Sequence, residues 1–153
     1  ITEFSVRDNI TLPGINHYQT AKFIQREKTE LISKQVVNEL RIKTPSIEQA
    51  ASLLSGGNQQ KIVLGKWMSL KPKVLLLDEP TRGVDVMSKG EIYQLIDDMA
   101  KMGIAILAIS SDLEEILRIS DRVLVMHKGN LAGQLGRTQV NEEAIMKLAT
   151  GTT

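Results

Sequence analysis

Hydrophobic and polar positions follow two different patterns along this chain, and the change lies near residue 57. The part before it is mostly polar. Residues 20–40 hold many Lys, Glu and Gln and few helix breakers, which predicts a helix with one partly buried face. Residues 8–14, DNITLPG, predict a loop because Pro-Gly marks a turn. Residues 46–53 begin with an S-x-x-Q capping box, which predicts a short helix.

The part after residue 57 alternates between continuous apolar runs and helical spacing. An apolar run bounded by turn residues is typical of a strand buried on both faces of a parallel sheet. A serine followed three residues later by a glutamate opens two helices, at Ser88 and Ser111, and Asn141 caps the last one. Strands alternating with helices predict an α/β fold with a mostly parallel sheet. The predicted strands are 73–78, 104–110 and 122–127, the last followed by a hairpin turn at 128–130.

Composition narrows the possible functions. Of the 153 residues, 42% are hydrophobic and 24% are charged, and the formal net charge is +1. This balance is ordinary for a soluble domain and gives no field that would attract nucleic acid or anionic lipid. The chain has no cysteine, which excludes disulfides and thiolate chemistry. No stretch is long and apolar enough to span a bilayer, and the first residues lack the pattern of a signal peptide.

The stretch LLSGGNQQK, residues 53–61, predicts an anion site. Its two glycines let backbone N–H groups approach a ligand closely, and the helix that follows adds unpaired donors and a positive dipole end. A phosphate is the natural ligand. The usual phosphate loop, G-x-x-x-x-G-K-S/T, is absent from this sequence, since residues 65–67 are Gly-Lys-Trp. The simpler interpretation is a helix-entry turn with Ser55 as its cap.

Two acids, Asp78 and Glu79, end the first predicted strand, at the edge where open α/β sheets bind ligands. Adjacent carboxylates at a strand end point in different directions, so they can take different roles. One can hold Mg²⁺, usually through water, and the other can orient and deprotonate a water molecule that attacks a phosphate in line. Taken alone, two solvated acids at a strand end are the simpler explanation.

Four segments in a fixed order, LSGGNQQK, DEPTRGVDV, SSDLEE and SDRVLVMHKG, resemble the ATPase subunit of ABC transporters. They match its signature helix, its Walker B strand with the D-loop, its switch loop and the strand that follows. The forms GNQQK and GVDV resemble the second nucleotide-binding domain of tandem ATPases from carbohydrate importers. The resemblance implies a partial P-loop NTPase core, with a helical signature subdomain at 1–56 and the C-terminal part of the α/β core at 57–153. The family's N-terminal antiparallel sheet and Walker A strand are missing from this sequence, so we expect a piece of a larger domain.

The resemblance also implies roles for the signature residues. In the family, two domains hold ATP face to face. Ser55 would offer a hydroxyl, and Gly57 a backbone N–H, to the γ-phosphate of ATP held by the partner domain. Gly56 and Gly57 would let the backbone come close to that phosphate. Asn58 and Gln59 share the place of the signature's final amide.

The remaining candidate residues follow from the other motifs. By resemblance, Asp78 holds Mg²⁺, Glu79 is the catalytic base and Asp85 is the D-loop acid that reaches across the interface between domains. Ser111 occupies the place of the family's switch histidine. Because serine is shorter and never charged, we expect Ser111 to cap the helix it opens. We therefore expect this site to be the weaker one of a tandem pair.

The resulting hypothesis is an ATP-binding and ATP-hydrolysing subunit that powers carbohydrate import, using ATP and Mg²⁺. Its expected place is peripheral, at the cytoplasmic face of the cell membrane. Its expected partners are a second nucleotide-binding domain and membrane permease subunits. Without a Walker A loop, the chain alone is expected to be inactive. The alternative is an ATP-independent interaction fragment without turnover, and an ATPase acting on nucleic acid is disfavoured by the net charge of +1.

The missing strand leads to an expectation about assembly. In the family, the strand before Walker A lies between the strands that match 104–110 and 122–127. Strand edges left without a neighbour invite pairing. We therefore expect one of three outcomes: the two strands pair directly, a second chain fills the space, or the C-terminal strands detach and repack. The last two outcomes favour self-association.

Overall fold

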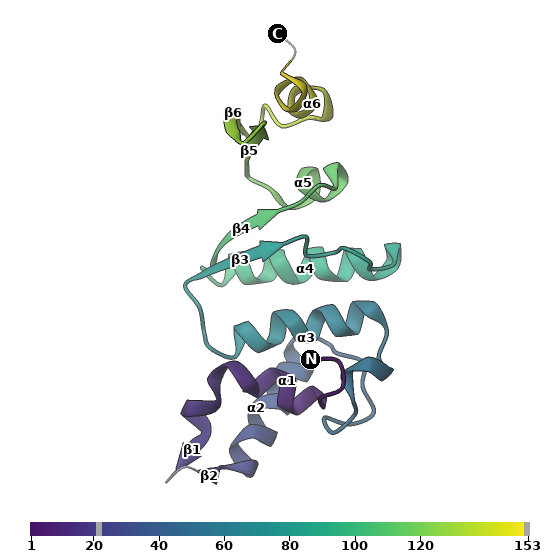
Figure 1. Cartoon of the computed structure of the whole chain (residues 1–153), viewed down its shortest axis with the longest axis vertical. Coiled ribbons are helices and arrows are strands. Elements are labelled where there is room, and N and C mark those ends of the chain that lie inside the picture. The colour runs from purple at the N-terminus through teal and green to yellow at the C-terminus, as the bar shows by residue number, and fades with distance from the viewer. Residues whose placement is uncertain (21–22, 152–153) are drawn as a thin grey trace.

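The computed structural model describes residues 1–20 and 23–151. Its elements form a stack of layers, with α1, α2 and α3 at one end, then α4, the β3–β4 sheet and α5, and the β5–β6 sheet with α6 at the other end (Figure 1). The α/β class predicted from the sequence is therefore confirmed. The helices are α1 (Val6–Thr11), α2 (Arg26–Glu39), α3 (Gly56–Met68), α4 (Val86–Lys101), α5 (Leu113–Ile119) and α6 (Glu142–Thr150), with 3₁₀ helices η1 (Leu12–Tyr18) and η2 (Ala51–Leu53). The strands are β1 (Gln19–Thr20), β2 (Phe23–Ile24), β3 (Val74–Asp78), β4 (Ala105–Ile109), β5 (Arg122–His127) and β6 (Asn130–Gly136).

A helix stands near the N-terminal end where the sequence predicted a loop. Helix α1 begins after Ser5, whose hydroxyl accepts a hydrogen bond from the Asp8 N–H at 3.0 Å. Val6 and Ile10 are fully buried because residues four apart lie on the same face of the helix. The loop expected at 8–14 is therefore wrong, and the Pro-Gly pair falls in η1, which continues directly from α1.

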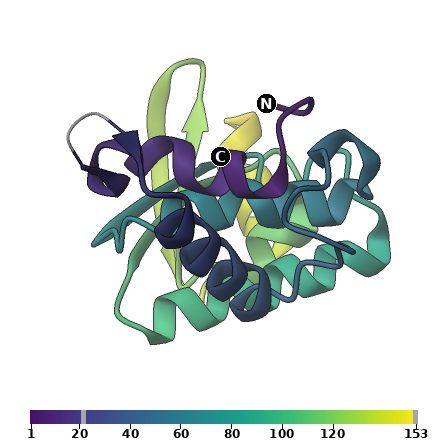
Figure 2. The same ribbon diagram turned by 90° about the horizontal axis from the view of Figure 1, so that it is seen from below.

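The helix predicted over 20–40 is shorter than expected. Residues 19–20 pair antiparallel with 23–24 as strands β1 and β2, and α2 begins only at Arg26. Residues 21–22, which the prediction also covered, lie outside the described residues. Viewed from below, α1 and α2 lie in front of α3, and α1 contacts both of the other helices (Figure 2).

Residues 46–53 do not form the helix predicted for them. Two of their backbone carbonyl groups bond to the start of α1 instead. Gln49 O accepts from the Val6 N–H at 2.9 Å, and Ile47 O accepts from the Arg7 N–H at 2.8 Å. Carbonyl groups that point at another helix are not aligned along an axis of their own, which helical hydrogen bonds require. Only the single turn η2 forms at the end of this stretch.

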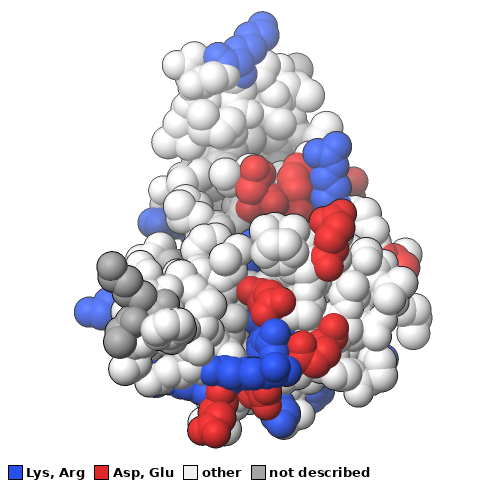
Figure 3. Space-filling model, turned by 60° about the horizontal axis from the view of Figure 1, so that its bottom comes forward, with Lys and Arg blue, Asp and Glu red and all other residues white. Residues whose placement is uncertain are grey.

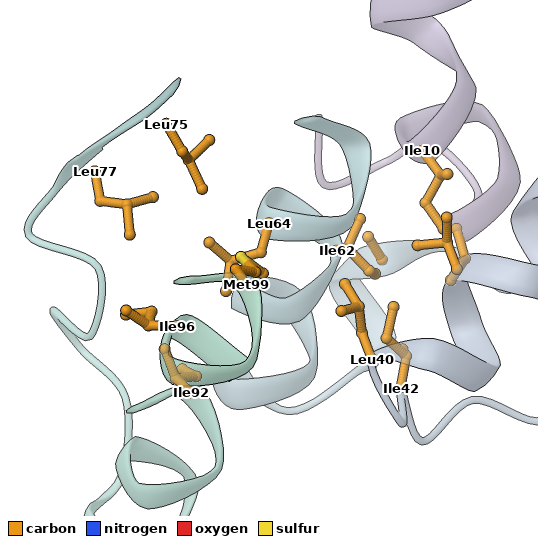
Figure 4. Packing of buried hydrophobic residues seen from close by; sticks show 13 residues of the cluster. Ile10, Leu40, Ile42, Ile62, Leu64, Leu75, Leu77, Ile92, Ile96 and Met99 are labelled. Carbon is orange, nitrogen blue, oxygen red and sulfur yellow. The ribbon is translucent and has the colours of Figure 1, made fainter. Parts of the chain in front are cut away.

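The main core lies between the β3–β4 sheet and helices α3 and α4. Strands β3 and β4 pair in parallel, with Leu75 opposite Ile106 and Leu77 opposite Ala108. The core contains residues from before and after residue 57. The division of the chain into two domains at that residue stays a prediction. Leu75 and Leu77 face the buried side chains of Leu64, Ile92, Ile96 and Met99 (Figure 4).

The two central strands are buried on one face only. Leu75 and Leu77 are 5% and 8% exposed, whereas Leu76 between them is 71% exposed. On β4, Ile109 is 61% exposed. The expectation of strands buried on both faces is therefore wrong for the described residues, because α4 covers one face of the sheet and nothing among those residues covers the other. An apolar sheet face is left open.

Strands β4 and β5 belong to different sheets in the part of the chain that the structure describes. Strand β5 pairs with β6 in an antiparallel hairpin, and the predicted turn is confirmed: Lys128 and Gly129 both have positive φ, 46° and 80°. Val123, Val125 and Ile145 form a second, small core with α6. A single chain therefore keeps the two strands in separate sheets, which contradicts direct pairing. Filling of the space by a second chain stays a prediction, as does detachment and repacking of the C-terminal strands.

Candidate functional site

The signature stretch forms the start of helix α3. Ser55 stands at the N-cap position, but its hydroxyl makes no cap bond and instead accepts a hydrogen bond from Asn58 Nδ2 at 2.9 Å. Asn58 Oδ1 accepts from the Lys43 N–H at 2.8 Å. The interpretation of Ser55 as a cap is therefore wrong. Ser55 and Gly56 are exposed, so the hydroxyl and the helix start are open to a ligand.

Gly57 is buried against helix α4. A Cβ placed on Gly57 would lie 2.5 Å from the Ser88 Cβ, closer than two non-bonded carbon atoms approach. The close approach of α4 therefore requires glycine here, independently of any ligand. Gly56 differs, because a Cβ there would meet only the Gly83 carbonyl oxygen, at 3.5 Å.

Gln59 lies beside a small pocket of about 240 Å³, which Gly56 and Arg82 also line. Its Nε2 donates to Leu54 O at 2.9 Å. Gln59 and Asn58 both bond to their own chain, so in this structure the two signature amides support the start of α3.

Lys61, at the end of the signature stretch, ties α3 to its neighbours. Its side chain is 3% exposed and donates to Glu91 Oε2 on α4 at 2.7 Å and to Arg41 O at 3.1 Å. The hydrogen bond from Lys61 holds the pKa of Glu91 below its usual value. Sequence reasoning missed this pair, because a lysine in GNQQK resembles a solvent-facing residue.

Asp85 caps helix α4. Its Oδ1 accepts from the Ser88 N–H at 2.9 Å, and this bond lowers the pKa of Asp85. The capping box predicted at Ser88 is therefore wrong, since α4 already begins at Val86. The predicted cap of the last helix is confirmed, because Asn141 Oδ1 accepts from the Ala144 N–H at 2.8 Å.

Asp78 ends strand β3 and is exposed. Across residues 1–20 and 23–151, no group of three or more His, Cys, Asp and Glu residues comes together as a metal cluster. Mg²⁺ does not need such a cluster, because it binds through one or two carboxylates together with water and phosphate oxygens. A single exposed carboxylate at a strand end fits that requirement when a phosphate ligand supplies further oxygens.

Glu79 has a backbone conformation that non-glycine residues rarely adopt, with φ at 48°. Its N–H donates to Ile109 O at 2.8 Å, and its carboxylate Oε1 accepts from the Ser111 N–H at 3.0 Å. Backbone conformations of this kind cost about 1–3 kcal/mol and cluster at functional sites. The structure therefore turns Glu79 away from the line of β3 and toward the start of α5.

Asp112, not Ser111, caps helix α5. Its Oδ1 accepts from the N–H groups of Glu114 and Glu115 at 3.1 and 3.3 Å. Its Oδ2 forms an ion pair with Lys89 Nζ on α4 at 2.5 Å. The expectation that Ser111 caps this helix is wrong, because the next residue offers a carboxylate, which accepts two backbone bonds at once.

Glu79 and Ser111 meet at a pocket of about 440 Å³, formed by the loop after β3, the first turns of α4 and the start of α5. The sequence reasoning missed the other residues that line it, among them Thr81, Lys89, Asp112 and Glu115. The predicted signature residues, 55–59, lie at the start of α3 and do not line this pocket. On the face shown in Figure 3, acidic and basic side chains lie beside one another instead of forming a field of one sign.

The family described as ABC transporter matches residues 1–82, more than half of the chain. The chain belongs to the ABC transporter family. It is 47% identical over 151 residues to a ribose import ATP-binding protein of Streptococcus agalactiae serotype Ia, covering 99% of this chain and 31% of that protein. It is 46% identical over 147 residues to a putative ribose/galactose/methyl galactoside import ATP-binding protein of Pseudomonas fluorescens, covering 96% of this chain and 28% of that protein. The chain thus spans about a third of the length of these relatives.

Solved ABC transporter structures share the fold. A putative metal-chelate type ABC transporter in an inward-facing conformation superposes with a TM-score of 0.82 at 19% identity, covering 97% of this chain and 59% of that one. A dimeric ATP-binding cassette in a post-hydrolysis state, bound to ADP and Pi, superposes with a TM-score of 0.75 at 20% identity, covering 90% and 58%. The predicted partial cassette fold is therefore confirmed.

Proposed function

We propose that this chain is the part of a carbohydrate-import ATPase that carries the signature and the Walker B acids. The observation that carries the proposal is the hydrogen bond between the Glu79 carboxylate and the Ser111 N–H at one pocket beside the sheet. This contact between Glu79 and Ser111 supports the assignment of Glu79 as the base and of Ser111 to the switch segment. The names of the relatives, ribose import and ribose/galactose/methyl galactoside import ATP-binding proteins, favour carbohydrate as the cargo and an ATPase over an ATP-independent interaction fragment.

The acids at the end of β3 would act on a nucleotide bound beside them. Mg²⁺, when bound, would neutralise charge on the phosphates near Asp78. Glu79 would orient a water molecule and take its proton as the water attacks the γ-phosphate. Its backbone is left-handed, and its carboxylate lines the pocket, where it accepts from the Ser111 N–H. Ser111 contributes its backbone N–H, which alanine or histidine at this position would supply equally.

The signature would serve a second nucleotide, held by a partner domain. Ser55 is exposed at the N-terminus of a helix of 13 residues, where unpaired N–H groups and the helix dipole favour an anion. Gly57 would offer its N–H, and Asp85 at the start of α4 would reach the same interface. The chain itself lacks a G-x-x-x-x-G-K-S/T loop, so by itself it is expected not to turn over ATP.

The proposed partners are therefore a second nucleotide-binding domain and membrane permease subunits, at the cytoplasmic face of the membrane. The word "import" in the names of the relatives supports a transport role. Within the described residues, no helix combines the length and the apolarity needed to cross a bilayer.

The test is Glu79→Gln in the complete natural protein that contains this chain. ATP hydrolysis and ATP-dependent sugar uptake should both fall by about tenfold or more, because general-base catalysis contributes at least that much. Nucleotide binding, measured by equilibrium dialysis, should persist. The control is Glu143→Gln, an exposed carboxylate on α6. Equal hydrolysis by Glu79→Gln and the wild type would exclude the proposed role.

A further inference from the structure

Glu115 is a buried carboxylate that the proposed chemistry does not use. It lies on α5 and is 1% exposed. Its Oε1 accepts a hydrogen bond from Thr81 Oγ1 at 2.7 Å, and Thr81 is itself 2% exposed. Burying a carboxyl group is costly, so this position in the core calls for an explanation beyond packing.

Thr81 belongs to the loop that carries Glu79. Only Pro80, which is also buried, separates them. The Thr81 hydroxyl therefore anchors one end of a stiff three-residue segment, since proline has a fixed φ. The other end is anchored by the bond from the Glu79 N–H to Ile109 O at 2.8 Å.

A second link crosses the same pocket. Lys89 Nζ on α4 bonds to Oδ2 of Asp112, the N-cap of α5, at 2.5 Å, and this pairing raises the pKa of Lys89 and lowers that of Asp112. Asp112 directly follows Ser111, whose N–H donates to the Glu79 carboxylate. The start of α5 is thus fixed to α4 by the Lys89–Asp112 pair and to the loop after β3 by the Thr81–Glu115 bond, and Glu79 lines the same pocket as these residues.

We propose that Glu115, through its hydrogen bond to Thr81, is a positioning residue that sets the direction of the Glu79 carboxylate for water activation. The inference rests on the proposed function. Thr81 and Glu115 bond to each other and are almost shielded from solvent. Their effect on turnover therefore passes through the position of Glu79. Loss of the link lets the loop turn, which lowers turnover without changing the contacts that bind nucleotide.

The experiment compares Thr81→Val, Thr81→Ser and the wild type in the complete natural protein. Valine keeps the shape of threonine and removes the hydroxyl, whereas serine keeps the hydroxyl. The measured quantity is the share of the ATP hydrolysis rate that is lost in Glu79→Gln. For this share, Thr81→Val should lower kcat by about tenfold or more, because small displacements of a reacting group have effects of that size. KM should stay within about twofold, and Thr81→Ser should recover most of the rate.

In Thr81→Val the buried Glu115 carboxyl loses its hydrogen-bond donor, and a second variant controls for the effect of that loss. In the double variant Thr81→Val/Glu115→Leu both partners are apolar, which leaves no unsatisfied polar group and allows the core to pack. Its kcat should be lowered as in Thr81→Val, with a melting temperature close to that of the wild type.

The results separate the two proposals. A folded Thr81→Val or double variant with wild-type kcat overturns the positioning role, as does a Thr81→Ser variant that is as slow as Thr81→Val. A raised KM with unchanged kcat also overturns it. If Glu79→Gln hydrolyses ATP as fast as the wild type, the proposed function fails and the positioning role fails with it.

Discussion

Gly57 in the first turn of α3 lies directly against Ser88 in the first turn of α4, with room for a hydrogen atom and not for a methyl group. A Cβ on Gly57 would lie 2.5 Å from the Ser88 Cβ and 2.6 Å from its Oγ. The two helices that begin after Ser55 and Asp85 are thus in contact at their N-terminal ends. Lys61 and Glu91 join the same two helices one turn further along.

Gly57→Ala should destabilise the fold. The added methyl group forces α3 and α4 apart, and overpacking of this kind costs about 1–3 kcal/mol. Urea-induced unfolding measures the loss. Gly56→Ala is the matched control, and its stability should stay within about 0.5 kcal/mol of the wild type. Adding Ser88→Gly to Gly57→Ala should restore part of the loss, and failure of both comparisons would contradict the contact.

The Lys61–Glu91 pair should make stability depend on pH. Bonding to Lys61 lowers the pKa of Glu91 in the folded chain. The contribution of a carboxyl with a lowered pKa is fully present above its unfolded pKa of about 4.3 and is lost as the pH falls through the folded value. Unfolding free energies measured from neutral pH down into this acidic range should fall less steeply in Glu91→Gln.

The control for this pH series is Glu39→Gln. Glu39 is exposed and accepts a hydrogen bond from the neutral Gln35, not from a lysine. Its variant should follow the wild-type pH profile. Identical slopes for Glu91→Gln and the wild type would show that the buried lysine does not stabilise the ionised Glu91.

Asp112→Ala should destabilise α5, whereas Ser111→Ala should not. Asp112 satisfies two backbone N–H groups and pairs with Lys89, and loss of an N-cap alone costs about 0.5–2 kcal/mol. Ser111 uses its backbone N–H, which alanine keeps, so its change should be within about 0.5 kcal/mol. Thermal unfolding measures the stability of both variants. A larger loss of stability in Ser111→Ala than in Asp112→Ala would show that Ser111 caps the helix.

Ser55→Arg in the complete natural protein should lower ATP hydrolysis and uptake. The long cation would stand where a partner's phosphate is proposed to approach, and loss of one donor to such a group costs about a hundredfold. Ser52→Arg, at another exposed serine three residues upstream, is the control and should retain activity. Equal activity of the two variants would exclude contact of Ser55 with the nucleotide.

The strands and long helices of the second half could be predicted because their apolar runs and helical spacing are continuous. Helix starts were harder, since Ser88 and Ser111 offered capping boxes while aspartates close by, Asp85 and Asp112, bind the N–H groups more strongly. The six-residue helix α1 escaped prediction because short helices owe their stability to tertiary contacts and not to propensity.

The candidate site was predictable only in part. Motifs located Glu79 and Ser111, and the structure places them in contact. Nothing in SSDLEE distinguishes Glu115, which is buried, from Glu114 beside it, which is exposed. Burial of one of two adjacent acids depends on where Thr81 lies, and that depends on the turn after β3.

The hairpin of β5 and β6 bears on the order in which the chain folds. Its ladder runs from Arg122 opposite Gly136 to His127 opposite Asn130, so its contacts are close in sequence. Hairpins form in about 1–10 μs, whereas parallel strands such as β3 and β4 must first place a helix between them. Because β5 shares no hydrogen-bonded ladder with β4 in the described residues, the hairpin needs no template from the central sheet. We therefore expect the chain to nucleate at two independent places, one local and fast, the other spanning α4 and slower.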